Sequence, residues 1–477
     1  MISLSTPLVW IVFPALLAAV LLLIQRRERL VTGLATILTA GLAFLAWRLP
    51  VKELFFISRW TIRLSDNWSV LGRQFILGAA ERPALIVLYL TAAFWFGASY
   101  VARPGRGFVP LGLGIVVVLT AAIAVEPFLY AALLIELAVL LSIPLLIPAP
   151  GAFQRGILRY LTYQTLGMPF ILFAGWMLTG IETAPAEQAL VLRLSLLIGL
   201  GFAFLVGVFP FHSWIPMLME EAHPYAVAFI FLLMPGAITF FGIYFLDRYV
   251  WLRDSEGLCV VLRSTGVLMV AFAGLWAAFQ RHLGRMLGYA VILEIGMSLI
   301  AICLKEHSLG FGQENGVGVG TNSAIFFVSL LPRSISLGVW ALALTFIQRQ
   351  TPTLRFFDVQ GIARRLPVAG SALIFAHFSL VGLPLLAGYP VRIALLNSLA
   401  QTSFYTSLGV LLGMVGLMTG SLRTLAVLVM GVESDWHSVE TWGQRFYLIL
   451  GMIALIVVGL FPQWFLPFVA DLAQVFP

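Results

Sequence analysis

Fourteen apolar stretches of membrane-spanning length constrain this chain more than any other feature of its sequence. A helix needs about 20 consecutive apolar residues to cross the hydrocarbon core of a bilayer, and only helices and closed barrels satisfy their backbone hydrogen bonds there. The sequence therefore predicts an all-α polytopic membrane protein with about 14 transmembrane helices. The predicted spans are 7–24, 30–48, 84–102, 107–125, 127–148, 155–178, 190–209, 225–246, 258–279, 285–304, 322–347, 368–394, 404–431 and 445–466.

Composition excludes a large soluble catalytic domain. Hydrophobic residues make up 61% of the chain and charged residues only 10%, whereas soluble proteins carry about 25% charged residues. Cys259 and Cys303 have no CxxC spacing, so neither a disulfide framework nor a metal site is expected. The sequence has no Gly-rich phosphate loop, haem-type CxxCH or nucleophile elbow. No catalytic residue, metal or cofactor is therefore predicted in this chain.

Basic residues collect in alternate short loops, and most loops between them are neutral or acidic. The long basic loop at 50–83 breaks this pattern, but loops of that length translocate with less regard to charge. By the positive-inside rule the basic loops face the cytoplasm. Both termini are therefore expected on the non-cytoplasmic side of a bacterial inner membrane. The net charge of +7 is therefore interpreted as a sign of the chain's orientation in the membrane, and no nucleic-acid partner is predicted. The residues that set this pattern are Arg26, Arg27, Arg29, Arg103, Arg106, Arg155, Arg159, Arg281, Arg285, Arg349, Arg355, Arg364 and Arg365.

No linker is long enough to separate domains, so residues 1–477 are expected to form a single membrane domain. Within it, corresponding helices of spans 4–8 and spans 9–13 are interrupted by Pro or Gly. Such pairs indicate inverted repeats with ion sites at their interface. The expected parts are spans 1–3 at 1–106 with an outer hairpin at 50–83, repeats at 107–246 and 258–431, and a last span within 445–477. Residues 306–321 are also expected outside the bilayer.

A polar elbow, FPFHSWIP at 209–216, interrupts span 7 at Pro210. Placing acids and histidines between membrane-length helices costs free energy unless they line a water-filled cavity or lie at the membrane surface. The elbow group is therefore a candidate ion path, and a membrane-surface loop with solvated charges stays the alternative. The candidates here are His212, Glu221 and His223, with Glu220 beside them. A second interruption, in span 12, lies at Gly382 and Pro384.

Ionisable residues inside the spans are few. Glu136 lies in span 5 and Glu294 in span 10, where a carboxylate must be paired, hydrated or neutral. For both, a proton-relay role and a protonated acid in one interhelical hydrogen bond stay open. His377 can titrate near neutral pH, although a lone helix histidine is more often hydrogen-bonded in place. Arg333 and Arg392 are permanent charges that set a field or pair with an acid, because guanidinium is not deprotonated in proteins.

The elbow, followed by Glu221-Ala222, resembles the FPFHxWLPxAxxEAP signature of the antiporter-like membrane subunits. That family comprises proton-pumping subunits of respiratory complex I (NADH–quinone oxidoreductase) and large subunits of Mrp-type sodium/proton antiporters and membrane hydrogenases. The resemblance covers roughly residues 65–430. Further segments agree in order: NWSVLGRQFIL at 67–77, Glu136 at the place of the span-5 glutamate, RMLGYAVILEIG at 285–296, QGIARRLP at 360–367, and Gly382-Leu383-Pro384 with Gly388-Tyr389 and Arg392.

The chain departs from this family at the lysines that the resemblance implies for proton transfer. The span-7 lysine position is Leu205, and the span-8 position falls within Met234–Ala237, which has no lysine. Arg333 and Arg392 stand at the lysine positions of spans 11 and 12. A buried lysine can shift its pKa toward neutrality and alternate in charge, whereas leucine and arginine cannot. Pro235 is expected to distort span 8.

The resemblance implies an antiporter-like subunit of a complex I-like or Mrp-like assembly that contributes to proton or cation translocation through a degenerate path. Its expected partners are homologous membrane subunits, a peripheral or redox subunit, and the bilayer. Any quinone-reductase activity would belong to the assembly, with no redox chemistry in this chain. The alternative is a structural or energy-coupling subunit that docks a partner without conducting. A stand-alone transporter is less favoured, because the other mid-span residues are nearly all apolar or small.

Overall fold

The computed structural model describes residues 2–48, 54–57, 60–70, 72–78, 81–147, 154–178, 188–253, 256–304, 324–430 and 436–464. They are mostly helical. The chain forms two compact units, the first made of Met1–Ile147, Leu161–Val206 and Leu233–Asp254, and the second of Pro148–Tyr160, Gly207–Leu232 and Ser255–Pro477. The stretch 306–321, expected outside the bilayer, lies outside the described residues.

Each predicted span coincides with one or two helices, because apolar runs of this length satisfy their backbone groups only in helices. The helices in chain order are η1 (Leu8–Val12), α1 (Phe13–Leu23), α2 (Glu28–Arg48), α3 (Arg82–Ala102), α4 (Phe108–Ala124), η2 (Phe128–Tyr130), α5 (Ala131–Leu146), α6 (Arg155–Leu178), α7 (Gln188–Val206), α8 (Trp214–Glu221), α9 (Pro224–Arg248), α10 (Val250–Arg253), α11 (Glu256–Phe279), α12 (Leu283–Ile302), α13 (Ala324–Gln348), η4 (Ile362–Arg364), α14 (Pro367–Val381), α15 (Tyr389–Thr402), α16 (Phe404–Val429), α17 (Trp442–Leu460) and η5 (Pro462–Trp464).

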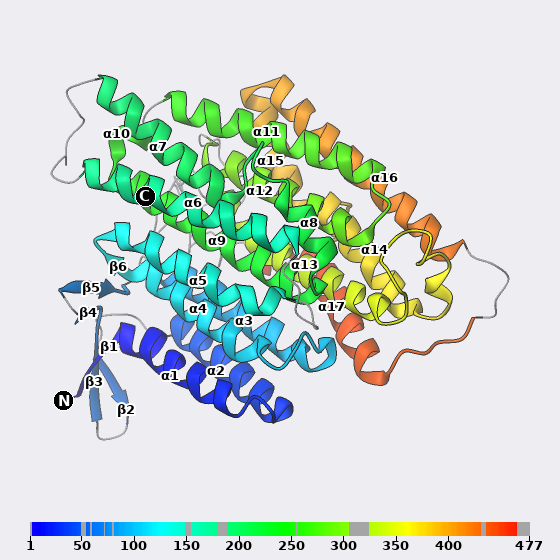
Figure 1. The fold of residues 1–477 in the computed structure, drawn as a ribbon, viewed down its shortest axis with the longest axis horizontal. Coiled ribbons are helices and arrows are strands. Elements are labelled where there is room, and N and C mark those ends of the chain that lie inside the picture. The colour runs from blue at the N-terminus through cyan, green and yellow to red at the C-terminus, as the bar shows by residue number, and fades with distance from the viewer. Residues whose placement is uncertain are drawn as a thin grey trace. The chain divides into compact units, whose positions relative to one another are not determined.

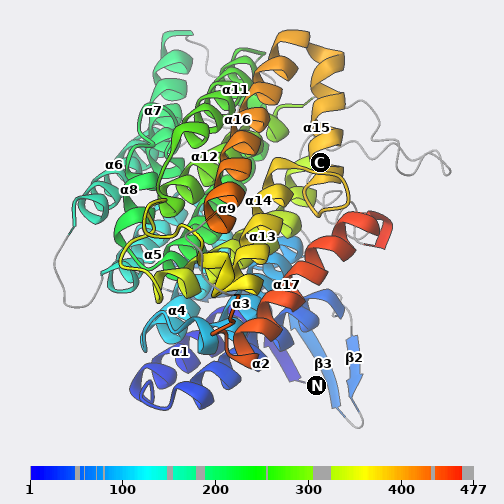
Figure 2. The ribbon, with the colours of Figure 1, turned by 90° about the vertical axis from the view of Figure 1, so that its right-hand side faces the viewer.

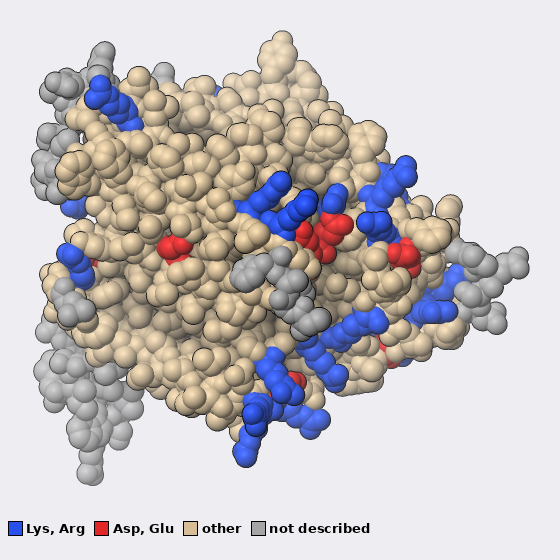
Figure 3. Space-filling model, in the orientation of Figure 1, with Lys and Arg blue, Asp and Glu red and all other residues tan. Residues whose placement is uncertain are grey.

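Among the described residues, eight helices are long and apolar enough to cross a membrane, judged by length and composition. Shorter apolar helices, α4, α5 and α14 among them, lie at other predicted spans. Large apolar side chains such as Leu411, Leu412 and Val415 on α16 are exposed, as expected for a face in contact with lipid. Figure 3 shows the same character over one face, where uncharged residues dominate and charged ones gather in a few clusters. The count of fourteen spans and the inverted repeats stay predictions.

Unit 1 carries two small sheets beside its helices. The first has the order β1 (Ile2–Ser5), β3 (Trp60–Ser65), β2 (Leu54–Ile57), with β1 parallel to β3. The second has the order β4 (Asn67–Val70), β5 (Arg73–Ile76), β6 (Val125–Glu126). The stretch 50–83 therefore contributes two antiparallel hairpins instead of one. Among its helices, α2 packs along α3 and α4 along α5 (Figure 1).

Unit 2 is built from helices that hold the second interruption. Its most extensive helix pairs are α11 with α16, α11 with α12, and α13 with α14. Helices α13, α14 and α17 lie side by side (Figure 2). The α11–α16 crossing is close because glycines face each other: an added Cβ at Gly274 would collide with the backbone of Gly413, and one at Gly416 with the backbone of Gly274. Small residues of this kind let helix backbones approach in membranes.

Both predicted interruptions lie between separate helices. Pro210 lies in the turn between α7, which ends at Val206, and α8, which begins at Trp214. Gly382 and Pro384 lie between α14 and α15. In contrast, α9 continues through Pro235 as one helix. The expected distortion of span 8 therefore does not break this helix.

Candidate functional site

The interruption between α14 and α15 exposes polar backbone groups inside unit 2. Gly382 has a φ of +89°, and an added Cβ there would lie 2.9 Å from Cβ of Arg392. Glycine takes this left-handed conformation without steric cost, and it also leaves room for the arginine. The last carbonyls of a helix lack intrahelical partners and carry partial negative charge. The Leu380 carbonyl accepts bonds from Arg392 Nε at 3.3 Å and Nη2 at 3.1 Å.

Arg392 also forms an ion pair with Glu294, which places a carboxylate of α12 against the interruption. Nη2 of Arg392 donates to Oε1 of Glu294. Both residues are buried, with exposed fractions of 5% for Arg392 and 3% for Glu294. Breaking a buried pair by removing one partner leaves an uncompensated charge and is strongly destabilising. Glu294 is therefore held as a partner of Arg392 from α15.

Arg333 on α13 supplies a second guanidinium beside the pair of Arg392 and Glu294. This residue is 3% exposed. Its Nη1 donates to Ser298 Oγ at 3.2 Å. Ser298, one turn beyond Glu294, in turn donates to the Glu294 carbonyl oxygen at 2.9 Å. Nε and Nη2 of Arg333 are buried and have no hydrogen-bond partner among the described residues. Arg333 is therefore only partly satisfied.

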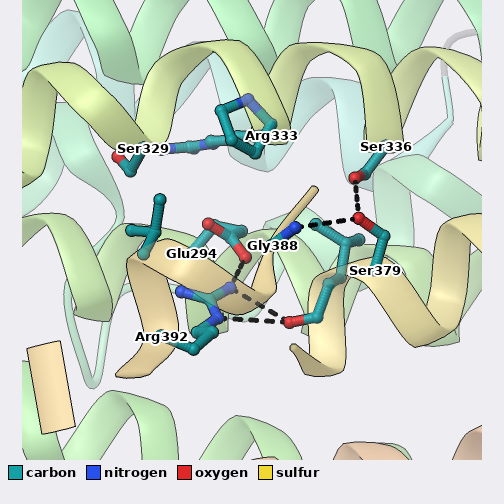
Figure 4. Close-up of a pocket in the computed structure, with 10 residues that line it drawn as sticks. Glu294, Ser329, Arg333, Ser336, Ser379, Gly388 and Arg392 are labelled. Atoms are coloured by element: carbon teal, nitrogen blue, oxygen red, sulfur yellow. Dashed lines mark hydrogen bonds and ion pairs between the residues drawn. The ribbon is translucent and has the colours of Figure 1, made fainter. Parts of the chain in front are cut away.

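These side chains surround a small cavity (Figure 4). It is lined by Glu294, Ser329, Pro332, Arg333, Ser336, Ser379, Leu380, Gly388, Val391 and Arg392. Ser379 Oγ accepts from Ser336 Oγ at 2.8 Å and from the Gly388 N–H at 3.2 Å. The space for the centre of a water molecule is about 10 Å³, which is near the minimum that holds one water. We call these residues the buried arginine cluster.

His377, the other candidate of span 12, does not line this cavity. Its ring is fully buried on α14 and packs against Trp340 of α13, with ring centroids 4.1 Å apart. Neither ring nitrogen has a hydrogen-bond partner in the part of the chain that the structure describes. The expectation of a hydrogen-bonded histidine therefore does not hold for these residues. The structure does not join His377 to Glu294 through any side chain described here.

The elbow residues are engaged in local contacts of unit 2. Glu220 forms an ion pair with Arg285 at the start of α12. Glu221 accepts a bond from the Gly156 N–H at 2.7 Å. The ring of His212 stacks on Phe209 with centroids 5.4 Å apart. These contacts tie α8 to α12 and to the start of α6, and they do not bring His212, Glu221 and His223 together around one ligand. The described residues contain no group of three or more His, Cys, Asp or Glu that could hold a metal.

Comparison with known proteins supports the resemblance of the elbow and the interruptions. The family model described as NADH:quinone oxidoreductase/Mrp antiporter, TM matches residues 158–419, which is more than half of the chain. The chain belongs to this family. Its membership and its apolar helices make it an integral membrane protein. The match includes α8, α12, α13, α14 and α15, and so the whole buried arginine cluster.

One sequence relative matches most of the chain, and two solved structures share its fold over nearly its full length. NADH-quinone oxidoreductase subunit N of Cupriavidus taiwanensis is 24% identical over 379 residues, which is 78% of this chain and 74% of that protein. A chain of the Mrp complex from Dietzia sp. DQ12-45-1b aligns with a TM-score of 0.79 at 15% identity, covering 98% of this chain and 96% of that one. A chain of Thermus thermophilus respiratory complex I aligns with a TM-score of 0.75 at 18% identity, covering 98% of each.

Unit 1 of this antiporter-family chain holds the other acid candidate, Glu136, which is half-buried and has no cation partner among the described residues. Oε1 of Glu136 accepts from Thr165 Oγ1 at 2.7 Å, and its buried Oε2 has no partner among the described residues. Leu205, at the place of the family lysine, contributes its carbonyl oxygen to Gln164 Nε2 at 2.8 Å. Its side chain packs toward Gly167 on α6, where an added Cβ would lie 2.7 Å from Leu205 Cγ. Close packing of an apolar side chain thus occupies the position that the sequence resemblance assigns to the family lysine.

Sequence reasoning missed the serines and backbone groups of the cluster. Ser298 lies four residues after Glu294, on the same helix face, so its position was readable. Ser336 and Ser379 carry no comparable signal, because they meet only when α13 and α14 pack together. The Leu380 carbonyl becomes an acceptor only because α14 ends at Val381.

His282 at the start of α12 predicts a pH dependence of stability. Burial is the main cause that lowers the pKa of His282 below 6.5; Glu220 opposes this, and Arg285 and Arg355 lower the pKa further. The folded chain therefore holds this ring neutral, and its contribution to stability is present above about pH 6.5 and is lost as pH falls through the lower folded-state pKa. We expect the melting temperature to fall below about pH 6.5, and to fall less steeply in His282→Asn.

Asparagine is chosen because it still accepts the N-cap bond that His282 Nδ1 now takes from the Arg285 N–H at 3.4 Å. The exposed His437 provides a matched control, and His437→Asn should leave the slope unchanged. Thermal unfolding of the detergent-purified chain between about pH 7.5 and about pH 5 spans the relevant range. Equal slopes for wild type and His282→Asn would contradict the prediction.

Proposed function

We propose that this chain is an antiporter-like membrane subunit of a complex I-like or Mrp-like assembly, and that it contributes to moving protons or other cations across the membrane. The observation that carries the proposal is the ionisable Glu294 buried between two guanidinium groups at an interrupted helix. Interrupted helices with buried charge are where membrane transporters place their ion sites. Family membership supports the same function.

The internal path would be altered relative to lysine-containing relatives. Glu136, Glu294 and His377 are the groups that can change protonation, and Arg333 and Arg392 are fixed charges. The elbow candidates His212, Glu221 and His223 would serve as path residues only by leaving their present contacts. The pKa of His223 is lowered to about 4 by burial and by Arg349, so this ring would be neutral near pH 7.

Other subunits of the assembly would supply the electron transfer that this chain does not carry out. The relative from Cupriavidus taiwanensis is named as a subunit, and two similar chains come from an Mrp complex and from complex I. We infer that homologous membrane subunits and a peripheral or redox subunit are the partners, and that any electron transfer takes place in them. From the loop charges we infer that both termini face away from the cytoplasm, and we propose a bacterial inner membrane as the location.

A structural or energy-coupling subunit is the second candidate, and a specific observation favours it. Glu136 has no cation partner among the described residues, and the Leu205 side chain is packed against α6. A group that alternates in charge beside Glu136 is therefore missing from this part of unit 1. In this alternative the chain holds a partner and does not itself conduct.

Proton flux in vesicles that carry the intact assembly separates the two candidates. We expect Glu136→Gln to remove most of the flux while the complex still assembles, because glutamine keeps the shape and cannot release a proton. Glu126→Gln is the matched control, since Glu126 is an exposed carboxylate of unit 1 outside the helices. Unchanged flux in Glu136→Gln would take unit 1 out of the proton path and favour the coupling role.

A further inference from the structure

The buried arginine cluster carries one positive charge more than it can balance. Arg333 and Arg392 each contribute one positive charge, and Glu294 is the only acid among the residues that line the described cavity. Glu440, another buried acid of unit 2, is engaged elsewhere with the Ala369 N–H and with Arg445. Taking an uncompensated charge out of water is costly, and arginine cannot lower this cost by losing its proton.

The unbalanced charge is located on Arg333. In Figure 4 the Glu294 carboxylate turns toward Arg392, and a dashed line joins the two, whereas none reaches Arg333. Nε and Nη2 of Arg333 are buried donors without a partner in the described residues, and the side chain lines the cavity. Two unsatisfied donors on a permanent cation require an acceptor, and a negatively charged acceptor also cancels the excess charge.

The size of the cavity limits what this acceptor can be. The hydroxyls of Ser336 and Ser379 bond each other, and Ser379 Oγ also accepts from the Gly388 N–H, so both serines are already engaged within the lining. The space is about 10 Å³ for a water centre, close to the minimum for a single water-sized species. Polyatomic anions such as sulfate or phosphate exceed this volume.

We propose that the cavity beside Arg333 is a binding site for one small monovalent anion of the halide class. The anion would accept from Nε and Nη2 of Arg333, with its charge balancing the cluster. A water molecule could accept the same bonds, but it would leave the excess charge in place. The site does not depend on proton conduction by this chain, so flux measurements and anion binding test separate statements.

Equilibrium binding of radioactive chloride to the full chain, purified in detergent in chloride-free gluconate buffer, tests the site directly. We expect one chloride per chain in wild type and none in Arg333→Met, which keeps an apolar stem and removes the donors and the charge. Arg423→Met is the matched control, because Arg423 lies elsewhere in unit 2 and donates to the Ala278 carbonyl oxygen. This control should still bind one chloride.

Competition keeps the test decisive if Arg333→Met does not fold. Unlabelled fluoride should displace chloride from wild type, and sulfate at equal ionic strength should not. Chloride should also raise the melting temperature of wild type as the chloride concentration increases, because a ligand that binds only the folded state stabilises it. The proposal is overturned if wild type binds no chloride, if Arg333→Met binds as wild type does, or if sulfate displaces chloride equally well, which would indicate surface arginines.

Discussion

Glu294→Gln is expected to destabilise the protein by about 3–5 kcal/mol, the range measured when one partner of a buried ion pair is removed. The substitution leaves Arg333 and Arg392 buried in one cavity with no carboxylate between them. The side chains of the cluster change from a net charge of +1 to +2, because Glu294 is the only acid among the residues described as lining the cavity.

The net charge of the lining side chains also predicts the order of stability of the other variants. Arg392→Met leaves Glu294 and Arg333 as an oppositely charged pair, so it should cost less than Glu294→Gln. The double variant Glu294→Gln/Arg392→Met returns the net charge to +1 and should recover part of the loss. Thermal unfolding of the four chains in one buffer of fixed chloride concentration measures the order. An Arg392→Met chain less stable than the Glu294→Gln chain would show that the ion pair itself, rather than the net charge, governs stability.

Gly413→Ala should destabilise the protein by about 1–3 kcal/mol, the usual cost of overpacking a tight core. An added Cβ at Gly413 would collide with the Val270 carbonyl oxygen of α11. Backbone atoms cannot move aside as a flexible side chain can, so α11 and α16 must separate. Their contact is among the most extensive in unit 2.

Gly41→Ala on α2 provides the control for this prediction. A Cβ at Gly41 meets nothing within 4 Å, and alanine favours helix over glycine by up to about 1 kcal/mol. The control should therefore be neutral or slightly more stable. Melting temperatures of both variants in the same detergent give the comparison. Equal effects of the two substitutions would mean that the crossing tolerates a wider separation than the structure shows.

The fold class was readable from the sequence because bilayer thickness sets the length of an apolar helix. Every predicted span coincides with helix, and the interruptions at Pro210 and Gly382 lie between helical segments. The small sheets of unit 1 were less readable. β1 pairs with β3 over a separation of about sixty residues, and nothing local in Ile2–Ser5 indicates that partner.

The site was predicted as a set of residues and not as an arrangement. Glu294, Arg333 and Arg392 stand out because charge is rare inside apolar spans. Their pairing is not readable, since Glu294 and Arg392 are 98 residues apart in sequence and meet only through packing of α12 against its neighbours. The same limit applies to Glu221, whose partner is a backbone N–H at Gly156. No sequence pattern marks a backbone group as a ligand for a distant side chain.

Arg392 has a mechanical consequence for the interrupted helix. From α15 it bonds the carboxylate of α12 and the terminal carbonyl of α14, so a single side chain is the common joint of three helical segments. If any one of these segments is displaced, the hydrogen bonds through which Arg392 joins it to the other segments are stretched. Motion at the interruption is therefore concerted. If the angle between α14 and α15 changes, either α12 moves with them, or Arg392 loses its bond to Glu294 or its bonds to the Leu380 carbonyl oxygen.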